Sequence, residues 1–359
     1  MESNSPRIIQ KNHMNLIIYF CILLSFSNSL LAKDSQRLPQ IHRPEKDSAW
    51  LPLTYLANGT FDVIQNPYWF SQRNYGNKVG VFWDRIKDPH HNIKKDGGYR
   101  KLIEDEFFSS RVLPNIGLHA IGGAYDTLWL RQYFEYYNVP AAGFFSFLFT
   151  YGAHVGNEAL ETTSDEITSH DHIADIYIFD VAAFLMSYSP TIMNYLVKDL
   201  DMKAWHFNPV YDLNHDDFFN AGLNYIFRPK ALSFGNDKFR PLYFLGMQTM
   251  LGLSYDYSRE NTLTTAAGMS LTNPLKQKGR FVGAFFHEYQ GELEASLFLN
   301  GSEDFRYRLN LYDTFFYRFM NANQSKSYQV GLVLGEKKGS DYAFGININL
   351  PIGIGAISN

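Results

Sequence analysis

The stretch Tyr243-Phe-Leu-Gly-Met-Gln-Thr-Met-Leu-Gly-Leu-Ser-Tyr-Asp-Tyr-Ser258 decides the fold class, because the character of its side chains differs between odd and even positions. The odd-numbered positions carry Tyr, Leu, Met, Thr, Leu, Leu, Tyr and Tyr, whereas the even-numbered positions are mostly small or polar. A period of two is typical of a β-strand with two different faces. After the turn residues 258–261, the run 262–271 repeats the rule, so the chain predicts a series of paired strands.

The same alternation continues to the end of the chain, in runs near 219–227, 281–299, 307–311, 328–334 and 342–350. Together with the two runs above, these five give seven strands, or eight if the long one breaks at Gly291. Tilted strands of about ten residues can cross a hydrocarbon layer, and Tyr and Phe at strand ends are typical of membrane girdles. The sequence therefore predicts a mainly β protein, an antiparallel transmembrane β-barrel of about 8–12 strands over residues 206–359, with a helical subdomain. A soluble β-sandwich, which also alternates, remains the alternative.

The two faces of these strands are assigned to opposite environments. The side chains predicted to face lipid are Leu245, Leu251, Leu263, Leu332, Phe344 and Ile346. Those predicted to face a polar interior are Gln248, Asp256, Gln329 and Asn347.

In this pattern, residues 206–359 resemble bacterial outer-membrane β-barrel proteins. The resemblance implies two partners, the lipid bilayer and the barrel assembly machinery. The chain departs from the family habit at its end, Gly353-Ile-Gly-Ala-Ile-Ser-Asn359, which lacks a terminal aromatic residue.

The N-terminal segment predicts export. Arg7 and Lys11 precede an apolar stretch at 16–26, and a polar sequence follows Ala32, which is the layout of a cleaved signal peptide. Cys21 is the single cysteine and lies within that segment, so the mature chain would have no disulfide, thiol nucleophile or cysteine-ligated metal. The predicted location is the bacterial outer membrane, with residues 1–32 removed and residues 33–60 forming a flexible lead.

Composition narrows the function. Aromatic residues make up 16% of the 359 residues and charged residues 19%, which excludes a disordered chain or a coiled coil. The net charge is −4 and no basic tract occurs, so nucleic acid is not an expected partner. No hydrolase, nucleotide-binding or metalloprotease motif is present. A serine near His119 or His287 could form a hydrolase dyad, but chance offers many such pairs in a chain with 11 histidines.

In the middle of the chain, the alternation of apolar and polar residues with a period of two stops. Residues 125–137, 141–161 and 171–187 lack alternation and predict helices, with a further helix after Pro190. The run 139–155 is nearly all apolar, so a helical inner-membrane protein with a periplasmic β domain is an alternative. Two further strands are expected at 61–70 and 78–83, which makes 61–205 a unit of N-terminal strands and helices.

One group of residues could carry chemistry. His154, Glu158 and Glu161 share a helix face at positions i, i+4 and i+7, and Asp171, Asp175 and Asp180 follow on the next helix. Such carboxylates could hold a divalent cation or support acid–base chemistry. Charges that stabilise the ends of two helices are the simpler interpretation. No other cofactor is expected.

The segment Gly156-Asn-Glu-Ala-Leu-Glu161, followed by Ala174-Asp-Ile-Tyr-Ile-Phe-Asp180, resembles a helix pair of uncharacterised bacterial envelope proteins, in which E-x-x-E ends one helix and aspartates open the next. It is also similar to a glycopeptide-resistance membrane family. The sequence thus favours a structural, binding or transport role in the envelope over catalysis. An envelope enzyme that acts on lipid or polysaccharide through the carboxylates is the alternative function.

Overall fold

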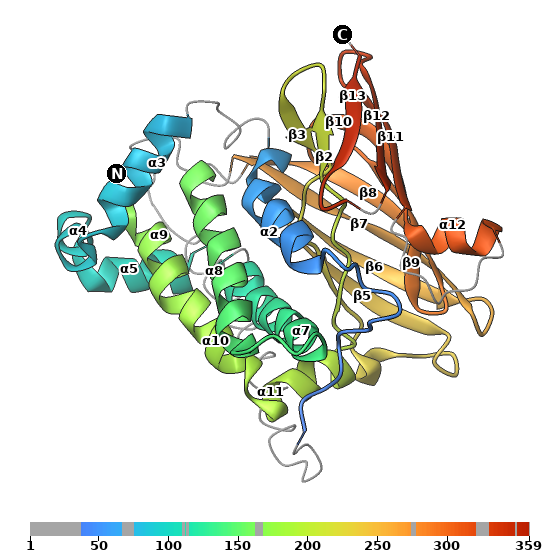
Figure 1. The fold of residues 1–359 in the computed structure, drawn as a ribbon, viewed down its shortest axis with the longest axis horizontal. Helices are drawn as coiled ribbons and strands as arrows, with labels where there is room; N and C mark the ends of the chain where they lie inside the picture. The colour runs from blue at the N-terminus through green and yellow to red at the C-terminus, as the bar shows by residue number, and fades with distance from the viewer. Residues whose placement is uncertain are drawn as a thin grey trace, which may run out of the picture.

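The computed structural model describes residues 37–66, 75–109, 112, 115–161, 168–273, 278–320, 330–348 and 350–358. A helical layer formed by the first half of the chain lies beside a strongly curved sheet formed by the second half (Figure 1).

Helices fill the described chain from Leu51 to Asp199. They are α2 (Leu51–Phe61), η1 (Asp62–Gln65), α3 (Tyr75–Ile86), α4 (Pro89–Lys95), α5 (Gly98–Phe107), η2 (Asn115–Gly122), α7 (Gly123–Tyr136), α8 (Ala142–Glu161), α9 (Ser169–Ala174), η3 (Asp175–Phe179), α10 (Asp180–Ser187), α11 (Pro190–Asn194) and η4 (Tyr195–Asp199). Proline opens three of them, at Pro52, Pro89 and Pro190, where the missing N–H costs nothing. The helices predicted between residues 125 and 199 are confirmed.

Two predictions for the N-terminal region are wrong. The expected strand at 78–83 lies within α3, whose apolar residues Phe82 and Ile86 are one helical turn apart and pack into the helical layer. The expected flexible lead contains α2 and a segment that is fixed by Gln132, whose side chain accepts hydrogen bonds from the backbone N–H groups of Ile41 and His42. In the other expected strand, 61–70, residues 61–65 are helical and 67–70 lie outside the described residues.

The described residues of the second half of the chain form one sheet of 13 strands. They are β1 (Lys203–Ala204), β2 (Val210–Asp212), β3 (Asp217–Phe219), β4 (Tyr225–Phe227), β5 (Phe239–Leu245), β6 (Gln248–Asp256), β7 (Asn261–Asn273), β8 (Lys278–Tyr289), β9 (Glu292–Leu299), β10 (Phe305–Leu311), β11 (Val330–Lys337), β12 (Tyr342–Ile348) and β13 (Gly353–Ile357). Two short helices accompany them, η5 (Lys230–Leu232) and α12 (Asp313–Met320). The strand order is β1-β4-β5-β6-β7-β8-β9-β10-β11-β12-β13-β2-β3.

The prediction of a closed antiparallel barrel is therefore wrong. The order has two ends, β1 and β3, and the sheet is mixed, because β13 pairs with β2 in parallel. The pairing of residues 353–355 with 210–212 joins segments more than 140 residues apart in the sequence. A period of two specifies faces but not which strands pair, so the sequence pattern did not contain this information.

Both end strands belong to one hairpin, residues 203–227. Its register runs from the pair Lys203 and Ile226 to the pair Asp212 and Asp217. Between these pairs, the N–H groups of Trp205 and Phe207 donate to the carbonyls of Asn224 and Gly222. The helical layer covers this hairpin: Asn58 of α2 donates to the carbonyls of Phe207 and Gly222 and accepts from the Gly222 N–H. The ends of the sheet are thus satisfied by protein groups.

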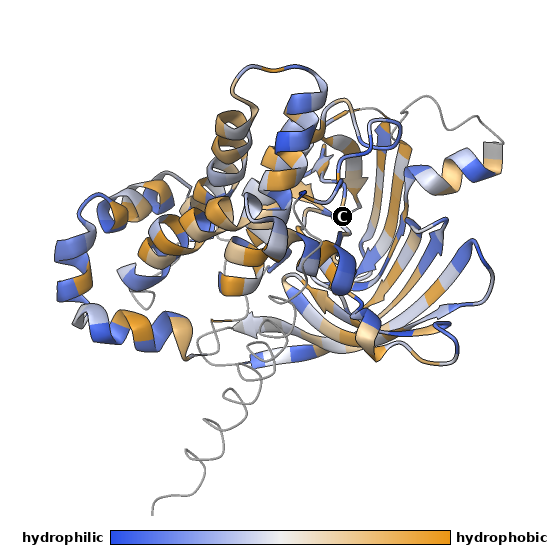
Figure 2. Cartoon of the chain, turned by 90° about the horizontal axis from the view of Figure 1, so that it is seen from below, coloured by the Kyte–Doolittle hydropathy of each residue, from blue (hydrophilic) through white to orange (hydrophobic). Residues whose placement is uncertain are grey.

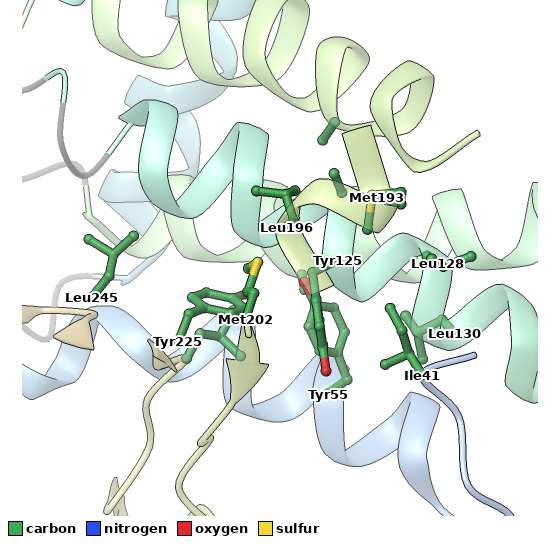
Figure 3. Close-up of a cluster of buried hydrophobic side chains, with 14 of the residues drawn as sticks. Ile41, Tyr55, Tyr125, Leu128, Leu130, Met193, Leu196, Met202, Tyr225 and Leu245 are labelled. Atoms are coloured by element: carbon green, nitrogen blue, oxygen red, sulfur yellow. The ribbon is translucent and has the colours of Figure 1, made fainter. Parts of the chain in front are cut away.

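The main core lies between the helices and the strands β4 and β5. Tyr225 and Leu245 reach it from the sheet, and Met193 and Leu196 from the helices (Figure 3). Leu245 is fully buried there because η2 lies against it: a Cβ at Gly117 would come within 2.7 Å of the leucine side chain. The prediction that Leu245 faces lipid is therefore wrong.

The concave side of the sheet is a packed interior. Gln248 and Asn347 point into it, as predicted, and Asp256 is half-buried at a strand end, where it accepts from Arg240. Gln329 lies outside the described residues. The interior is filled by an aromatic and aliphatic cluster that includes Trp205, Phe207, Phe244, Phe286 and Phe298. The expected polar lumen is thus wrong for this part of the sheet, because large rings fill the space between the facing strands.

Two ion pairs are buried in the same interior. Arg228 donates to both carboxylate oxygens of Glu288, at 2.5 and 3.0 Å, and neither side chain is exposed by more than 1%. Arg308 pairs with Glu303 at 3.2 Å and lies over the ring of Phe207. Such pairs hold the interior in one arrangement, since either partner alone would leave an unpaired buried charge.

The convex face of the sheet is apolar and exposed, and hydrophobic bands recur along its strands (Figure 2). Leu251 is 71% exposed and Phe344 is 49% exposed, while their sequence neighbours point inward. The outward orientation predicted for Leu251, Leu263, Phe344 and Ile346 is confirmed, and Leu332 is half-buried. We call this surface the convex face; its exposed apolar members are Leu251, Leu253, Leu263, Met269, Phe281, Phe285, Leu299, Leu334, Phe344, Ile346, Ile348 and Ile354.

In the part of the chain that the structure describes, no single helix has both the length and the apolar character needed to cross a membrane. The segments Ser169–Ser187 and Pro190–Asp199 would meet the criterion only as a pair, and they are bent by 84°. The run 139–155, which the sequence offers as an alternative transmembrane helix, lies mostly in α8. Its polar residues Ser146, Thr150 and His154 are buried there.

A buried carboxyl group at the helix–hairpin contact predicts a pH effect. Asp62 accepts hydrogen bonds from the Leu223 N–H, at 2.8 Å, and from the Gln65 side chain. Burial raises the pKa of Asp62 to about 7, above its ordinary value of 3.8. The folded protein then holds a proton that the unfolded chain loses, so the free energy of unfolding should fall between about pH 4 and pH 7.

Asp62→Asn should remove this part of the pH dependence. We expect the variant to match the wild type near pH 4 and to be roughly 2–4 kcal/mol more stable at pH 8. Denaturant unfolding across this range measures the difference, with the exposed Glu104→Gln as control. Stability curves that stay parallel for Asp62→Asn and wild type would contradict the assignment.

Candidate metal centre in the helical layer

Five titratable side chains from four helical elements converge inside the helical layer. η2 provides His119, α8 provides His154 and Glu158, η3 provides Asp175, and α10 begins with Asp180. We call these five residues the His/carboxylate centre. His154 and Glu158 are one helical turn apart, so α8 presents both to the same side.

The backbone of η3 explains how Asp175 and Asp180 meet. In an α-helix, side chains five positions apart point about 140° away from each other. η3 is a π-helical turn, in which the Asp180 N–H donates to the Asp175 carbonyl, an i to i+5 bond. The wider turn brings both carboxylates toward η2, which is itself π-helical and carries His119. Single π-helical turns occur frequently at functional sites.

His119 is the residue that all three carboxylates approach. Its Nε2 atom lies 3.4 Å from Glu158 Oε1 and 3.9 Å from Asp175 Oδ2, and its Nδ1 atom lies 3.1 Å from Asp180 Oδ1. The side chain of His119 is 12% exposed, whereas the three carboxylates are almost completely buried. The centre is therefore enclosed, with limited access to solvent beside His119.

Two more histidines orient the carboxylates. His154 Nδ1 lies 2.6 Å from Asp180 Oδ1, and His172 Nδ1 lies 2.6 Å from Glu158 Oε2. The opposite nitrogen of His172 faces Arg85 at 3.0 Å. Since Arg85 can only donate, His172 Nε2 accepts and its Nδ1–H donates to Glu158. Glu158 is thereby fixed with one oxygen toward His172 and the other toward His119.

The charges are strongly coupled. Burial favours the neutral carboxyl and so raises the pKa of Asp175 well above its ordinary value, and the nearby carboxylates Glu158 and Asp171 raise it further. Burial acts against the charge on His119, but Asp175, Asp180 and Glu158 outweigh it and raise the pKa of His119 well above its ordinary value. The pKa values of Glu158 and Asp180 lie below their ordinary ranges, because hydrogen bonds and charges from the histidines outweigh burial.

The structure brings together four of the six residues singled out in the sequence. His154, Glu158, Asp175 and Asp180 belong to the centre. Asp171 lies beside it and accepts a hydrogen bond at 3.2 Å from Asn115, whose side chain also donates to Glu106. Glu161, at the last position of α8, interacts with Lys78 of α3.

Sequence reasoning missed the central residue, His119, as a partner of these carboxylates. Nor did it single out His170 and His172, which are buried in α9. No sequence signal identified His119, since it lies 35 residues before His154 in an otherwise apolar segment.

A separate cavity of about 570 Å³ lies between the N-terminal segment, the hairpin and α12. Aromatic side chains line it, among them Tyr55, Trp129 and Trp205, together with charged groups such as Arg43 and Lys203. Tyr55 connects it to the His/carboxylate centre, since its hydroxyl lies 3.4 Å from His154 Nε2. The residues Glu158, Asp175 and Asp180 do not line this cavity.

Comparison with known proteins gives no relative: no family model, no curated protein and no solved structure matches the chain.

Proposed function

We propose that this chain is an envelope protein of the bacterial outer membrane, with a structural or binding role, in which the convex face contacts the hydrocarbon of the bilayer. The observation that carries the proposal is the continuity of that face. Exposed large hydrophobic side chains occur on every strand from β6 to β13, including Tyr307 on β10, and these strands are consecutive neighbours in the sheet. Soluble monomers rarely expose a contiguous apolar surface of this extent.

The convex face also lacks charge where lipid would be in contact with it. The outward positions that the structure describes between the ends of β6, β7, β8 and β12 include no Asp, Glu, Lys or Arg. Tyr255, Tyr257 and Tyr342 stand at or just beyond strand ends and are exposed. Aromatic residues at both edges of an apolar band are typical of a membrane interface.

A sheet in contact with lipid must not leave backbone groups unpaired. The arrangement meets this requirement, because the two end strands belong to the hairpin 203–227 and this hairpin lies under the helical layer. The strands that carry the convex face each have a hydrogen-bonded neighbour on both sides. The helical layer would then stand beside the membrane-facing strands, with the His/carboxylate centre inside it.

Cell fractionation tests the location. Expressed in a bacterial host with two membranes, the protein should sediment with the outer membrane and resist extraction by alkaline carbonate. N-terminal sequencing should place its first residue at or near Lys33, as the export signal predicts. Recovery of the folded protein in the soluble periplasmic fraction would contradict the proposal, and an uncleaved chain in the inner membrane would favour the helical alternative.

A further inference from the structure

We infer that the His/carboxylate centre is a binding site for one divalent transition-metal ion, held by His119, Glu158 and Asp175. This inference is independent of the membrane location proposed above. It starts from the atoms that face one another: His119 Nε2, Glu158 Oε1 and Asp175 Oδ2.

The separations fit an ion better than direct hydrogen bonds. The distances of 3.4 and 3.9 Å from His119 Nε2 to the two carboxylates are longer than good hydrogen bonds. Ligand atoms about 2.0–2.1 Å from a tetrahedral Zn²⁺ lie about 3.3 Å from each other. A small movement of Asp175 would therefore place all three atoms around one ion.

Unpartnered buried oxygens are the second observation. Asp175 Oδ1 and Asp180 Oδ2 are buried and have no hydrogen-bond partner in the described part of the protein. Both residues are only 3% exposed, so bulk water does not supply one. A buried carboxylate oxygen without a partner is costly and calls for a specific explanation, such as an ion. Asp175 has one unpartnered oxygen and directs the other toward His119, so it is the least satisfied member of the centre.

The surrounding hydrogen bonds are those that metal ligands need. A ligating histidine usually donates its other N–H to a carboxylate, which fixes the ring and its tautomer. Asp180 accepts from His119 Nδ1 in this way and is itself bound by His154. His172 donates to the non-ligating oxygen of Glu158. His119 and Glu158 thus each have a positioning residue.

The ligand types select the class of metal. Imidazole suits Zn²⁺, Fe²⁺, Ni²⁺ or Cu²⁺, whereas Mg²⁺, Ca²⁺ and Mn²⁺ prefer oxygen ligands. With a neutral His119 and two carboxylates, a divalent ion makes the site formally neutral, which matters in a buried location. Three protein ligands leave a fourth coordination position open on Zn²⁺, and His119, with 12% of its side chain exposed, is the most exposed of the three.

Zinc binding to the purified, chelator-treated full chain tests the inference. We expect one Zn²⁺ per chain by elemental analysis and a melting temperature that rises on adding Zn²⁺ and falls again with chelator. Glu158→Gln and Asp175→Asn should each weaken Zn²⁺ binding by tenfold or more. Asp171→Asn, a buried carboxylate outside the ligand set, is the matched control and should keep the affinity within about threefold.

Variants of the residues that position the ligands should lose affinity for Zn²⁺ but not the stoichiometry of binding. Asp180→Asn and His154→Ala should weaken Zn²⁺ binding by about 10–100-fold but keep one ion per chain. If these variants fail to fold, Co²⁺ bound to the wild type provides the readout, because a tetrahedral site gives intense visible absorption bands. A wild type that takes up no Zn²⁺ and shows no such Co²⁺ bands would overturn the inference, as would unchanged affinity in the folded Glu158→Gln and Asp175→Asn variants.

Discussion

Glu288→Gln should destabilise the protein by about 3–5 kcal/mol, the largest effect that we expect from a single substitution. Arg228 has no exposed surface and donates to both oxygens of Glu288. The amide keeps the size of the side chain but removes its charge, which leaves the guanidinium with the more exposed Asp201 as its remaining charged partner. Denaturant unfolding of the purified protein in a lipid or detergent medium measures the loss.

Glu292→Gln is the matched control on the next strand. Glu292 pairs with Arg43 and Lys46 at a partly exposed position, so its loss should cost no more than about 1 kcal/mol. The double variant Arg228→Met with Glu288→Leu should cost less than Glu288→Gln, because it leaves no unpaired charge. Equal small losses for Glu288→Gln and Glu292→Gln would show that Arg228 finds another partner or solvent.

Leu251→Arg should destabilise the membrane-bound protein by about 2–4 kcal/mol, the second-largest loss of stability that we expect. Leu251 lies in the middle of β6, is 71% exposed and has exposed apolar neighbours on the convex face. An arginine in water would cost little at such an exposed site, whereas an arginine against hydrocarbon must be dehydrated or drag water with it. Unfolding from lipid vesicles measures the difference.

Leu232→Arg controls for the substitution itself. Leu232 is 58% exposed in η5, outside the convex face, so arginine should be tolerated within about 0.5 kcal/mol. If both substitutions had a negligible effect, the proposed contact between the convex face and lipid would be contradicted.

The faces of the strands could be predicted from the sequence because they depend on local alternation alone. Leu251 and Phe344 point outward and Gln248 and Asn347 inward, as the period of two requires. The partner of each strand depends on distant residues, so the parallel pairing of β13 with β2 and the two ends of the sheet could not be predicted. Small residues such as Gly246 predict a polar interior, whereas Phe244 on the same strand face belongs to the aromatic cluster that fills it.

Part of the candidate site could also be predicted, because it depends on local helical geometry. Helical geometry placed His154 and Glu158 together, since four residues make about one turn. The approach of Asp175 to Asp180 depends on a π-helical turn, which cannot be predicted from the residue types in this segment. His119 reaches the centre only because η2 packs against η3 and α10, and such packing is a tertiary property.

A spin-label scan of β12 tests the central claim most directly, namely that the convex face lies in hydrocarbon. Nitroxides placed one at a time at residues 342–348, in protein reconstituted into lipid vesicles and with Cys21 replaced by serine if the signal is retained, report collisions with oxygen and with a water-soluble nickel chelate. Labels at Phe344 and Ile346 should collide often with oxygen and rarely with the chelate, whereas the exposed turn residue Ser340 should show the reverse. Equal access of the chelate to Phe344, Ile346 and Ser340 would contradict the account.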